Sequence, residues 1–269
     1  MTEAEMMFNQ TFWRFNRQWA SVSGFRDTVL SGMSAAESIQ GKIAAELYNS
    51  LTEDPEYRPL LHNPEEFAKN TSPEQFTEMV TTIRMKETGA ALDAATLVFA
   101  HSVLDGVAID CCRVTALHAP RDWEPDLDAR TFPLAEIRAA SYDALLAKKL
   151  NEHLDNLERE SLPKKAERLM ARCQPPPKWS PMIDYEFDGK LVTRFDNQRH
   201  MIIHGDALGK PLTEFALSKG NMYYLMRTGM YFIGLVNMKY HLQIDPGYIS
   251  AHIAEKSAHT STDNPQGCV

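Results

Sequence analysis

The chain has 269 residues with 36 acidic against 28 basic side chains, which gives a formal net charge of -8. This length is ample for a domain with a buried core. The negative charge argues against sequence-independent binding of nucleic acid over a broad basic surface. The four cysteines form no Cys-x-x-Cys pair, so we expect neither a zinc knuckle nor a disulfide framework.

The sequence also argues against secretion and membrane insertion. The first residues, MTEAEMMFNQ, lack the basic and apolar regions of a secretory signal. The most apolar segment, 222–236, is interrupted by Arg227 and is shorter than the roughly 18 residues that a membrane span requires. We therefore expect a cytosolic protein with no membrane contact.

The N-terminal third is expected to be helical and to pack on the rest of the chain. Aromatic residues at steps of three and four predict an amphipathic helix over 3–20: Phe8, Phe12, Phe15 and Trp19. A second helix is predicted over 34–51, before a proline-containing connector. Ser72, followed by Pro73 and then Gln75, has the pattern of a capping box, so a helix should begin there. Gly89 favours a kink or break in that helix.

A central helix is predicted over 90–118, because apolar residues recur there with heptad-like spacing. His101 lies in this stripe, and Asp105 follows four residues later, within reach on a helix. A buried histidine usually finds a polar partner, so a structural pairing of His101 with a nearby carboxylate competes with a role in a site.

Four more helices are expected: over 134–160, from Pro163 to the proline run at 175–177, over 188–204 and over 221–242. Gly229, in the stripe of the last one, would permit a close approach between helices. No alternating pattern of useful length predicts a strand, and 185–187 and 212–215 are the only short candidates. The predicted fold class is all-α.

The helix expected over 188–204 carries the chain's most distinctive group of polar side chains. Asp188 can cap its start, and Gly205 directly after His204 favours its end there. Arg199, His200 and His204 lie in its last two turns. Arg199 and His204 are five residues apart, about 140° around an ideal helix, so they converge only if the last turn loosens or if a second chain supplies one of them.

This segment resembles the Arg-x4-His signature of the HEPN superfamily: an arginine, a polar residue, three apolar residues, a histidine and a glycine. The resemblance implies a helical bundle over 89–247 that acts as a homodimer and cleaves RNA without a metal. It gives Arg199 the role of contacting phosphate, His204 that of general acid or base, and His200 that of the assisting polar residue. Residues 1–88 would be an additional N-terminal helical segment, and 248–269 a short helix and a disordered tail.

The resemblance also bears on partners. RNA is the expected substrate, and toxin or phage-defence roles in the superfamily suggest an antitoxin or other regulatory protein. Some members carry a tyrosine two positions after the histidine, where a partner modifies it, but this chain has Asp206 there. Residues 161–210 hold nine Lys or Arg against six Asp or Glu, a modest basic zone around the motif.

The residue chemistry suits metal-independent RNA cleavage. Histidine can take or give a proton near neutral pH, and arginine stays charged and can bind two phosphate oxygens. We expect no cofactor and no metal. If the central helix packs on the motif, His101, Asp105 and Asp196 are the candidates to support the site.

Three other interpretations use the same residues. His200 and His204 have the spacing of a zinc pair, with Asp196 or Asp206 as a third ligand. Arg199 could instead pair with Asp196 or Asp206 and only hold the helix end. The bundle could also be a non-catalytic module that binds RNA or a protein partner.

Overall fold

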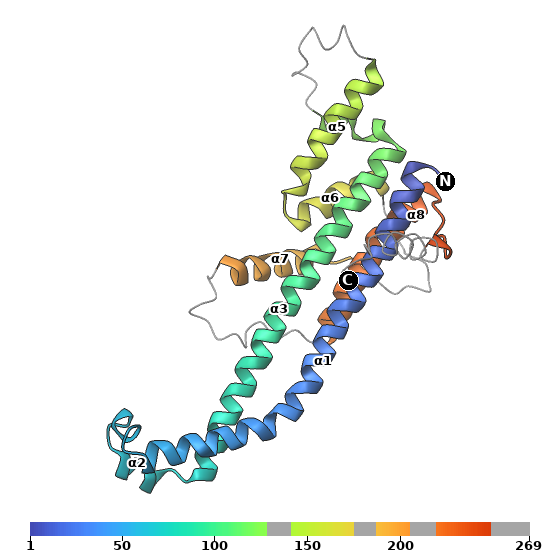
Figure 1. Cartoon of the computed structure of the whole chain (residues 1–269). Helices are drawn as coiled ribbons and strands as arrows, with labels where there is room; N and C mark the ends of the chain where they lie inside the picture. The colour runs from blue at the N-terminus through green and yellow to red at the C-terminus, as the bar shows by residue number, and fades with distance from the viewer. Residues whose placement is uncertain (128–140, 175–186, 205–218, 249–269) are drawn as a thin grey trace, which may run out of the picture. The chain divides into compact units, whose positions relative to one another are not determined.

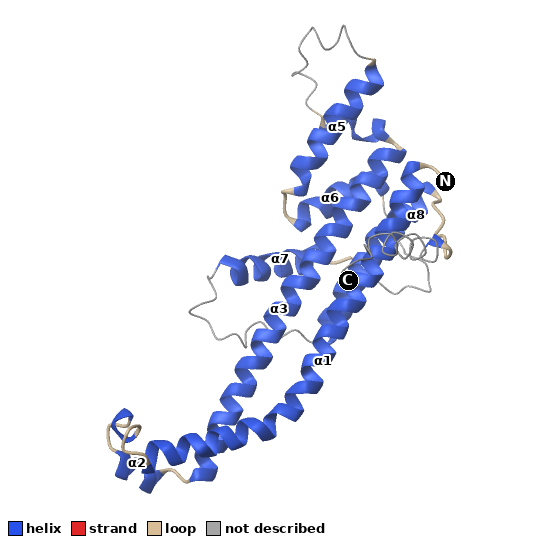
Figure 2. Ribbon diagram, viewed as in Figure 1, coloured by secondary structure: helices blue, strands red, loops and turns tan. Residues whose placement is uncertain are grey.

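A computed structural model describes residues 1–127, 141–174, 187–204 and 219–248 (Figure 1). Within these ranges the chain forms helices and loops and no strand, which confirms the predicted all-α class (Figure 2). Of the two short strand candidates, only Phe187 is described, and it is not in a strand. The remaining candidate residues, the proline run at 175–177 and the tail from 249 lie outside the described ranges.

Long helices dominate the described part of the chain. The α-helices are α1 (Glu3–Glu53), α2 (Pro64–Asn70), α3 (Pro73–His118), α5 (Tyr142–Glu158), α6 (Leu162–Cys173), α7 (Gly189–His204) and α8 (Lys219–Tyr240). Two 3-10 helices, η1 (Arg58–Leu60) and η2 (Pro120–Asp126), lie in the connections.

Two of these helices are longer than predicted. The helices expected over 3–20 and 34–51 are parts of the continuous helix α1, and the break expected at Gly89 is absent because α3 continues through it. A single glycine costs a helix only about 1 kcal/mol relative to alanine, and α1 contains no proline. Packing against other helices can offset this cost, and the local sequence pattern contains no information about that packing.

The helix starts predicted from capping residues are confirmed. The Ser72 hydroxyl accepts a hydrogen bond from the backbone N–H of Gln75 (3.2 Å), and the Gln75 side chain accepts one from the backbone N–H of Ser72 (3.0 Å). Asp188 Oδ1 accepts hydrogen bonds from the backbone N–H groups of Lys190 (2.9 Å) and Leu191 (3.2 Å). Both patterns satisfy N–H groups that have no partner inside the helix.

Contacts divide the chain into two compact units. Unit 1 contains residues 1–19, 101–196 and 222–269, and unit 2 contains residues 20–100 and 197–221. Helices α1, α3, α7 and α8 therefore each contribute to both. The domain boundaries predicted at 88/89 and 247/248 stay a prediction.

The core of unit 1 lies where α1, α3 and α8 pack together. Phe15, Leu104 and Phe232 are buried there. A Cβ atom added to Gly229 would lie 2.3 Å from the Phe15 ring and 3.1 Å from Leu104 Cδ2, so only glycine fits. The close helix approach predicted at Gly229 is thus present.

Helix α3, rather than the predicted segment 222–236, is the most apolar long helix of the described ranges. It is the one helix there that is long and apolar enough to cross a membrane by length and composition. Of its most apolar stretch, 56% is buried inside the protein. This burial is typical of the core helix of a soluble protein.

Unit 2 is built on a hairpin of two antiparallel helical segments, α1 from residue 20 and α3 up to residue 100, with α2 beside the connection (Figure 1). Aromatic rings of Tyr48, Phe67 and Phe76 lie 5.7–5.8 Å apart near that connection. The Tyr48 hydroxyl also donates a hydrogen bond to the Thr71 carbonyl (2.8 Å). These contacts close the end of the hairpin.

Candidate functional site

The first half of α7 is fixed within unit 1. The Tyr224 hydroxyl of α8 accepts a hydrogen bond from the Asp188 backbone N–H (3.0 Å), and the Phe187 ring stacks on Tyr231 at 5.5 Å. Phe195 on α7 is buried. The start and direction of α7 are therefore set by packing as well as by its cap.

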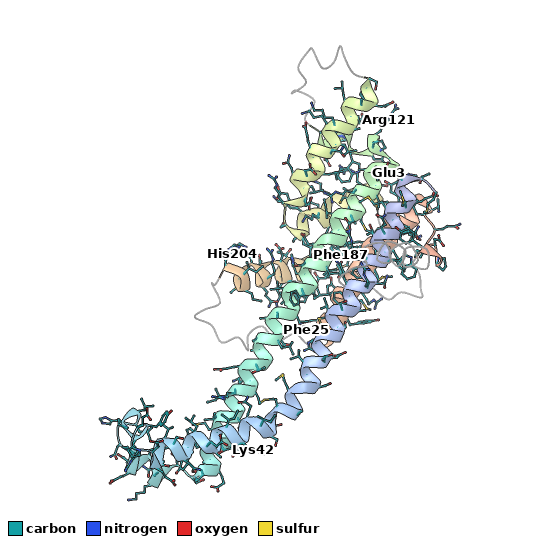
Figure 3. All side chains as sticks on the ribbon, viewed as in Figure 1. Glu3, Phe25, Lys42, Arg121, Phe187 and His204 are labelled. Carbon is teal, nitrogen blue, oxygen red and sulfur yellow. The ribbon has the colours of Figure 1, made fainter. Side chains whose placement is uncertain are left out.

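The second half of α7 belongs to unit 2 and carries the predicted motif. It is α-helical through His204, which lies at the end of the described segment (Figure 3). His200 and His204 are both exposed, and their ring centroids are 4.2 Å apart. One turn of helix thus presents two imidazoles together to solvent. Gly205 and Asp206 lie outside the described residues.

Arg199 and His204 do not converge within one chain. The last turn of α7 keeps α-helical geometry, so the five-residue spacing directs the two side chains about 140° apart. Arg199 Nε is buried and has no hydrogen-bond partner among the described residues. The arginine and His204 can meet at one phosphate only if a second chain takes part.

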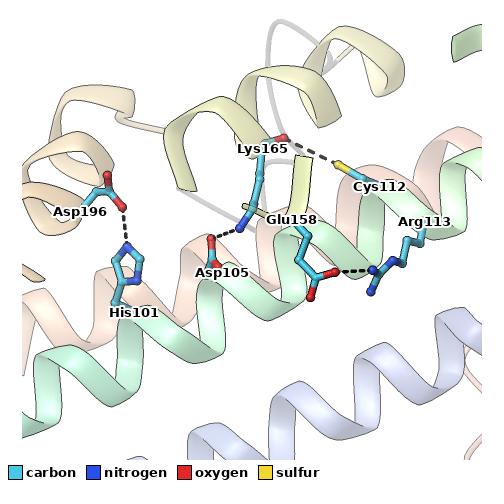
Figure 4. A network of polar contacts seen from close by, with 7 residues as sticks. All are labelled: His101, Asp105, Cys112, Arg113, Glu158, Lys165 and Asp196. Atoms are coloured by element: carbon cyan, nitrogen blue, oxygen red, sulfur yellow. Dashed lines mark hydrogen bonds and ion pairs between the residues drawn. The ribbon is translucent and has the colours of Figure 1, made fainter. Parts of the chain in front are cut away.

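Two of the three predicted supporting residues pair with each other. His101 Nε2 lies 2.8 Å from Asp196 Oδ1, and the histidine is buried (Figure 4). This contact joins α3 to α7 within unit 1. It is the pairing of a buried histidine with a carboxylate that the sequence suggested, although the carboxylate comes from another helix.

Asp105, four residues after His101, has a different partner. Its Oδ1 accepts a hydrogen bond from Lys165 Nζ of α6 at 2.6 Å (Figure 4). This contact is a salt bridge that joins α3 to α6. The role of His101, Asp105 and Asp196 in supporting the site stays a prediction, because these residues belong to unit 1 and the motif to unit 2.

The metal-site and ion-pair alternatives each required Asp196 or Asp206. An ion pair between Arg199 and Asp196 is not formed in the described residues, where Asp196 contacts His101. No group of three His, Cys, Asp or Glu side chains in the described part of the chain is arranged to hold a metal ion. His200 and His204 would supply two imidazole ligands, and Asp206, the other proposed third ligand, lies outside the described ranges.

Lys165 is a buried charged residue that the sequence analysis missed. It is fully buried on α6, and its carbonyl lies 3.8 Å from the Cys112 sulfur. Its position within the apolar stripe of α6, which contains Leu162, Ala166 and Leu169, was the available signal. A buried charge needs a partner, and Asp105 is that partner.

The buried cysteines have no features of a reactive site. Burial raises the pKa of Cys112 to about 12, and burial likewise raises that of Cys173 to about 12. Both thiols are therefore protonated at neutral pH, whereas the thiolate is the nucleophile. Cys111, Cys112 and Cys173 act as small apolar core residues.

Unit 1 also contains an open groove of about 710 Å³ between α1, α3 and α5. Leu117, Leu150 and Leu154 line it, with Glu3 and Arg113 among its polar residues. None of the predicted site residues contributes to this groove. We therefore assign it no part in the site.

Comparison with known proteins identified no relative of this chain. No protein-family model, no curated protein and no solved structure matches the chain. The resemblance to the HEPN superfamily rests on the motif around Arg199 and His204 and on the helical fold.

Proposed function

We propose that the protein is a metal-independent endoribonuclease of HEPN type that works as a homodimer. His204 of one chain and the partner subunit's Arg199 act on one phosphate, and His200 assists. A toxin–antitoxin or phage-defence setting, with a regulatory protein as partner, fits this activity. The proposal rests on the motif and on the place of its three side chains on α7.

The observation that carries the proposal is the pair of exposed imidazoles of His200 and His204, whose ring centroids are 4.2 Å apart on the helix turn that follows Arg199. Exposed histidines can exchange protons with a substrate and with solvent. A guanidinium that is not engaged by a neighbouring carboxylate keeps its donors available for phosphate oxygens. These are the groups that RNA cleavage without a metal requires.

In the proposed reaction His204 accepts the proton of the ribose 2′-hydroxyl. The 2′-oxygen attacks phosphorus, and the bond from phosphorus to the 5′-oxygen breaks, which leaves a 2′,3′-cyclic phosphate. His200 gives a proton to the departing 5′-oxygen. Arg199 stabilises the negative charge that builds up on the phosphate oxygens during this exchange.

The test is RNA cleavage in the presence of a metal chelator. Purified wild-type, Arg199→Ala and His204→Ala proteins are incubated with total RNA, with His62→Ala as the matched control because His62 is an exposed histidine that is not part of α7. We expect wild-type and control proteins to cleave, and each motif variant to lose about a hundred- to ten-thousand-fold in rate. Equal RNA patterns for all four proteins would overturn the proposal, and cleavage that the chelator abolishes would favour a metal.

A second candidate is a non-catalytic helical module that binds RNA or a protein partner. It is favoured by the divergence of Arg199 and His204 within one chain, since a binding surface does not need them to converge. RNA binding that Arg199→Ala weakens, together with intact RNA after long incubation, would select this candidate. Cleavage that depends on His204 would exclude it.

A further inference from the structure

One face of helix α7 is polar, exposed and free of carboxylates. Six exposed residues share a sector of about 120° around the helix axis and form what we name the α7 stripe. They are Lys190, Thr193, Arg194, Asn197, His200 and His204. The stripe contains both imidazoles of the candidate site and extends from them to the first turn of the helix, over about 21 Å.

The stripe faces away from the packed side of α7. The buried residues of this helix are Val192 and Phe195, and they point about 170° away from the centre of the stripe. One continuous helix fixes these directions relative to one another. Because every residue of the stripe is exposed, a ligand can reach it along its whole length.

The positive charges of the stripe are not neutralised by neighbouring residues. Helix α7 and its N-cap contain two carboxylates, Asp188 and Asp196, and neither belongs to the stripe. Asp188 Oδ1 caps the helix, and Asp196 Oδ1 contacts His101. Lys190 and Arg194 form no ion pair or side-chain hydrogen bond with another described residue. Their charged groups are therefore available to an anion.

We propose that the α7 stripe binds the phosphate backbone of the RNA strand that the protein cleaves, and that Lys190 and Arg194 contact phosphates away from the reacting one. This inference rests on the proposed function. Cations together with hydroxyl and amide donors suit a polyanion, and contacts of this kind position nucleic acid without reading its sequence. The net charge of -8 disfavours a broad RNA-binding surface but not contacts along one helix.

Spacing along α7 indicates how much RNA the stripe can hold. Arg194 and Lys190 precede His204 by about 15 and 21 Å along the helix axis. Phosphates of one stacked strand follow each other at about 3.4 Å, so the two cations would contact phosphates about four and six nucleotides from the cleaved bond. An RNA of that length can use both contacts, whereas a dinucleotide cannot.

The test measures RNA binding separately from cleavage. The probe is a fluorescent single-stranded RNA that is long enough to span the stripe and carries 2′-O-methyl groups, which remove the attacking hydroxyl. The stripe variant is Lys190→Ala with Arg194→Ala. The matched control is Lys42→Ala with Lys86→Ala, which removes the same charge from two exposed lysines of α1 and α3. Fluorescence anisotropy of the full chain gives the Kd over a series of salt concentrations.

The salt dependence of the affinity reports the number of phosphate contacts. Each contact to a single strand contributes about 0.7 to the slope of log affinity against log salt concentration. From about 50 to 200 mM salt, the affinity of the wild-type and control proteins should therefore fall about sevenfold more than that of the stripe variant, which has lost two contacts. Equal slopes for the three proteins, or a wild type that does not bind the probe, would overturn the inference.

Cleavage kinetics separate this inference from the proposed function. With a cleavable RNA of the same length, the stripe variant should show a higher KM, and a loss in kcat alone would contradict a binding role for Lys190 and Arg194. A protein that binds RNA through the stripe but leaves it intact supports the inference and overturns the proposed function. Cleavage that depends on His204 but not on Lys190 and Arg194 supports the proposed function and overturns the inference.

Discussion

Gly229 allows α8 to pack directly on the Phe15 ring of α1 in the core of unit 1. Phe15 is almost fully buried, so it has no free space into which to move. The variant Gly229→Ala should therefore lose about 1–3 kcal/mol of unfolding free energy through overpacking. Urea denaturation followed by circular dichroism measures this loss.

The control is Gly106→Ala, a glycine within the same unit on α3. A Cβ atom there meets nothing within 4 Å. Alanine favours the helix by about 0.5–1 kcal/mol, so this variant should be as stable as the wild type or more stable. Equal stability losses for both variants would show that the contact with Phe15 is not the cause.

His153 links the stability of unit 1 to pH. Its ring lies 5.9 Å from the Trp123 ring, and its Nε2 is buried without a hydrogen-bond partner in the described residues. Burial lowers the pKa of His153 below its ordinary value of 6.5, and the Arg168 guanidinium lowers it further. Protonation is therefore harder in the folded protein than in the unfolded chain.

A lowered histidine pKa gives stability that is fully present above pH 6.5 and is lost as the pH falls through the folded-state pKa. We expect the urea midpoint to decrease over this acidic range and to decrease less in His153→Phe, whose ring can stay beside Trp123. Midpoints measured at a series of pH values test this. Identical acid profiles for the two proteins would contradict the assignment to His153.

At the scale of a single element, the N-terminal cap of α7 should contribute to the stability of that helix. Substituting Asp188 with alanine removes the acceptor for the Lys190 and Leu191 backbone N–H groups. The loss should be about 0.5–2 kcal/mol, while Asp188→Asn, which keeps an acceptor, should lose less. Thermal unfolding of the three proteins measures this order, and a full loss in the asparagine variant would point to charge instead of capping.

The helix starts could be predicted from sequence because a cap is a local interaction. Ser72 and Asp188 lie within three residues of the N–H groups that they bind. The continuity of α1 and α3 could not be predicted in the same way, since it depends on packing between segments that are far apart in the sequence. Helix propensity is a weak guide where packing decides.

The candidate site shows the same difference between local features, which could be predicted, and long-range contacts, which could not. The position of Arg199, His200 and His204 on the last turns of one helix could be predicted, because it follows from helical periodicity. The partners of His101 and Asp105 could not, because Asp196 and Lys165 are 95 and 60 residues away in sequence. Long-range pairing is decided by tertiary packing and not by spacing on one helix.

At the scale of the whole molecule, the proposed activity requires two chains. One chain directs Arg199 and His204 about 140° apart, so a second chain has to supply one of the two side chains. The activity should therefore depend on assembly. RNA cleavage measured at decreasing protein concentration tests this dependence, and a monomer that cleaves at the full rate would contradict it.

Mixing two inactive variants tests the central claim most directly. In a heterodimer of Arg199→Ala with His204→Ala, one of the two composite sites keeps both side chains and the other keeps neither. After subunit exchange, random pairing of equal amounts should restore on the order of a quarter of the wild-type RNA cleavage rate. If the mixture stays as inactive as each variant alone while both remain dimeric, the site shared between two chains is wrong.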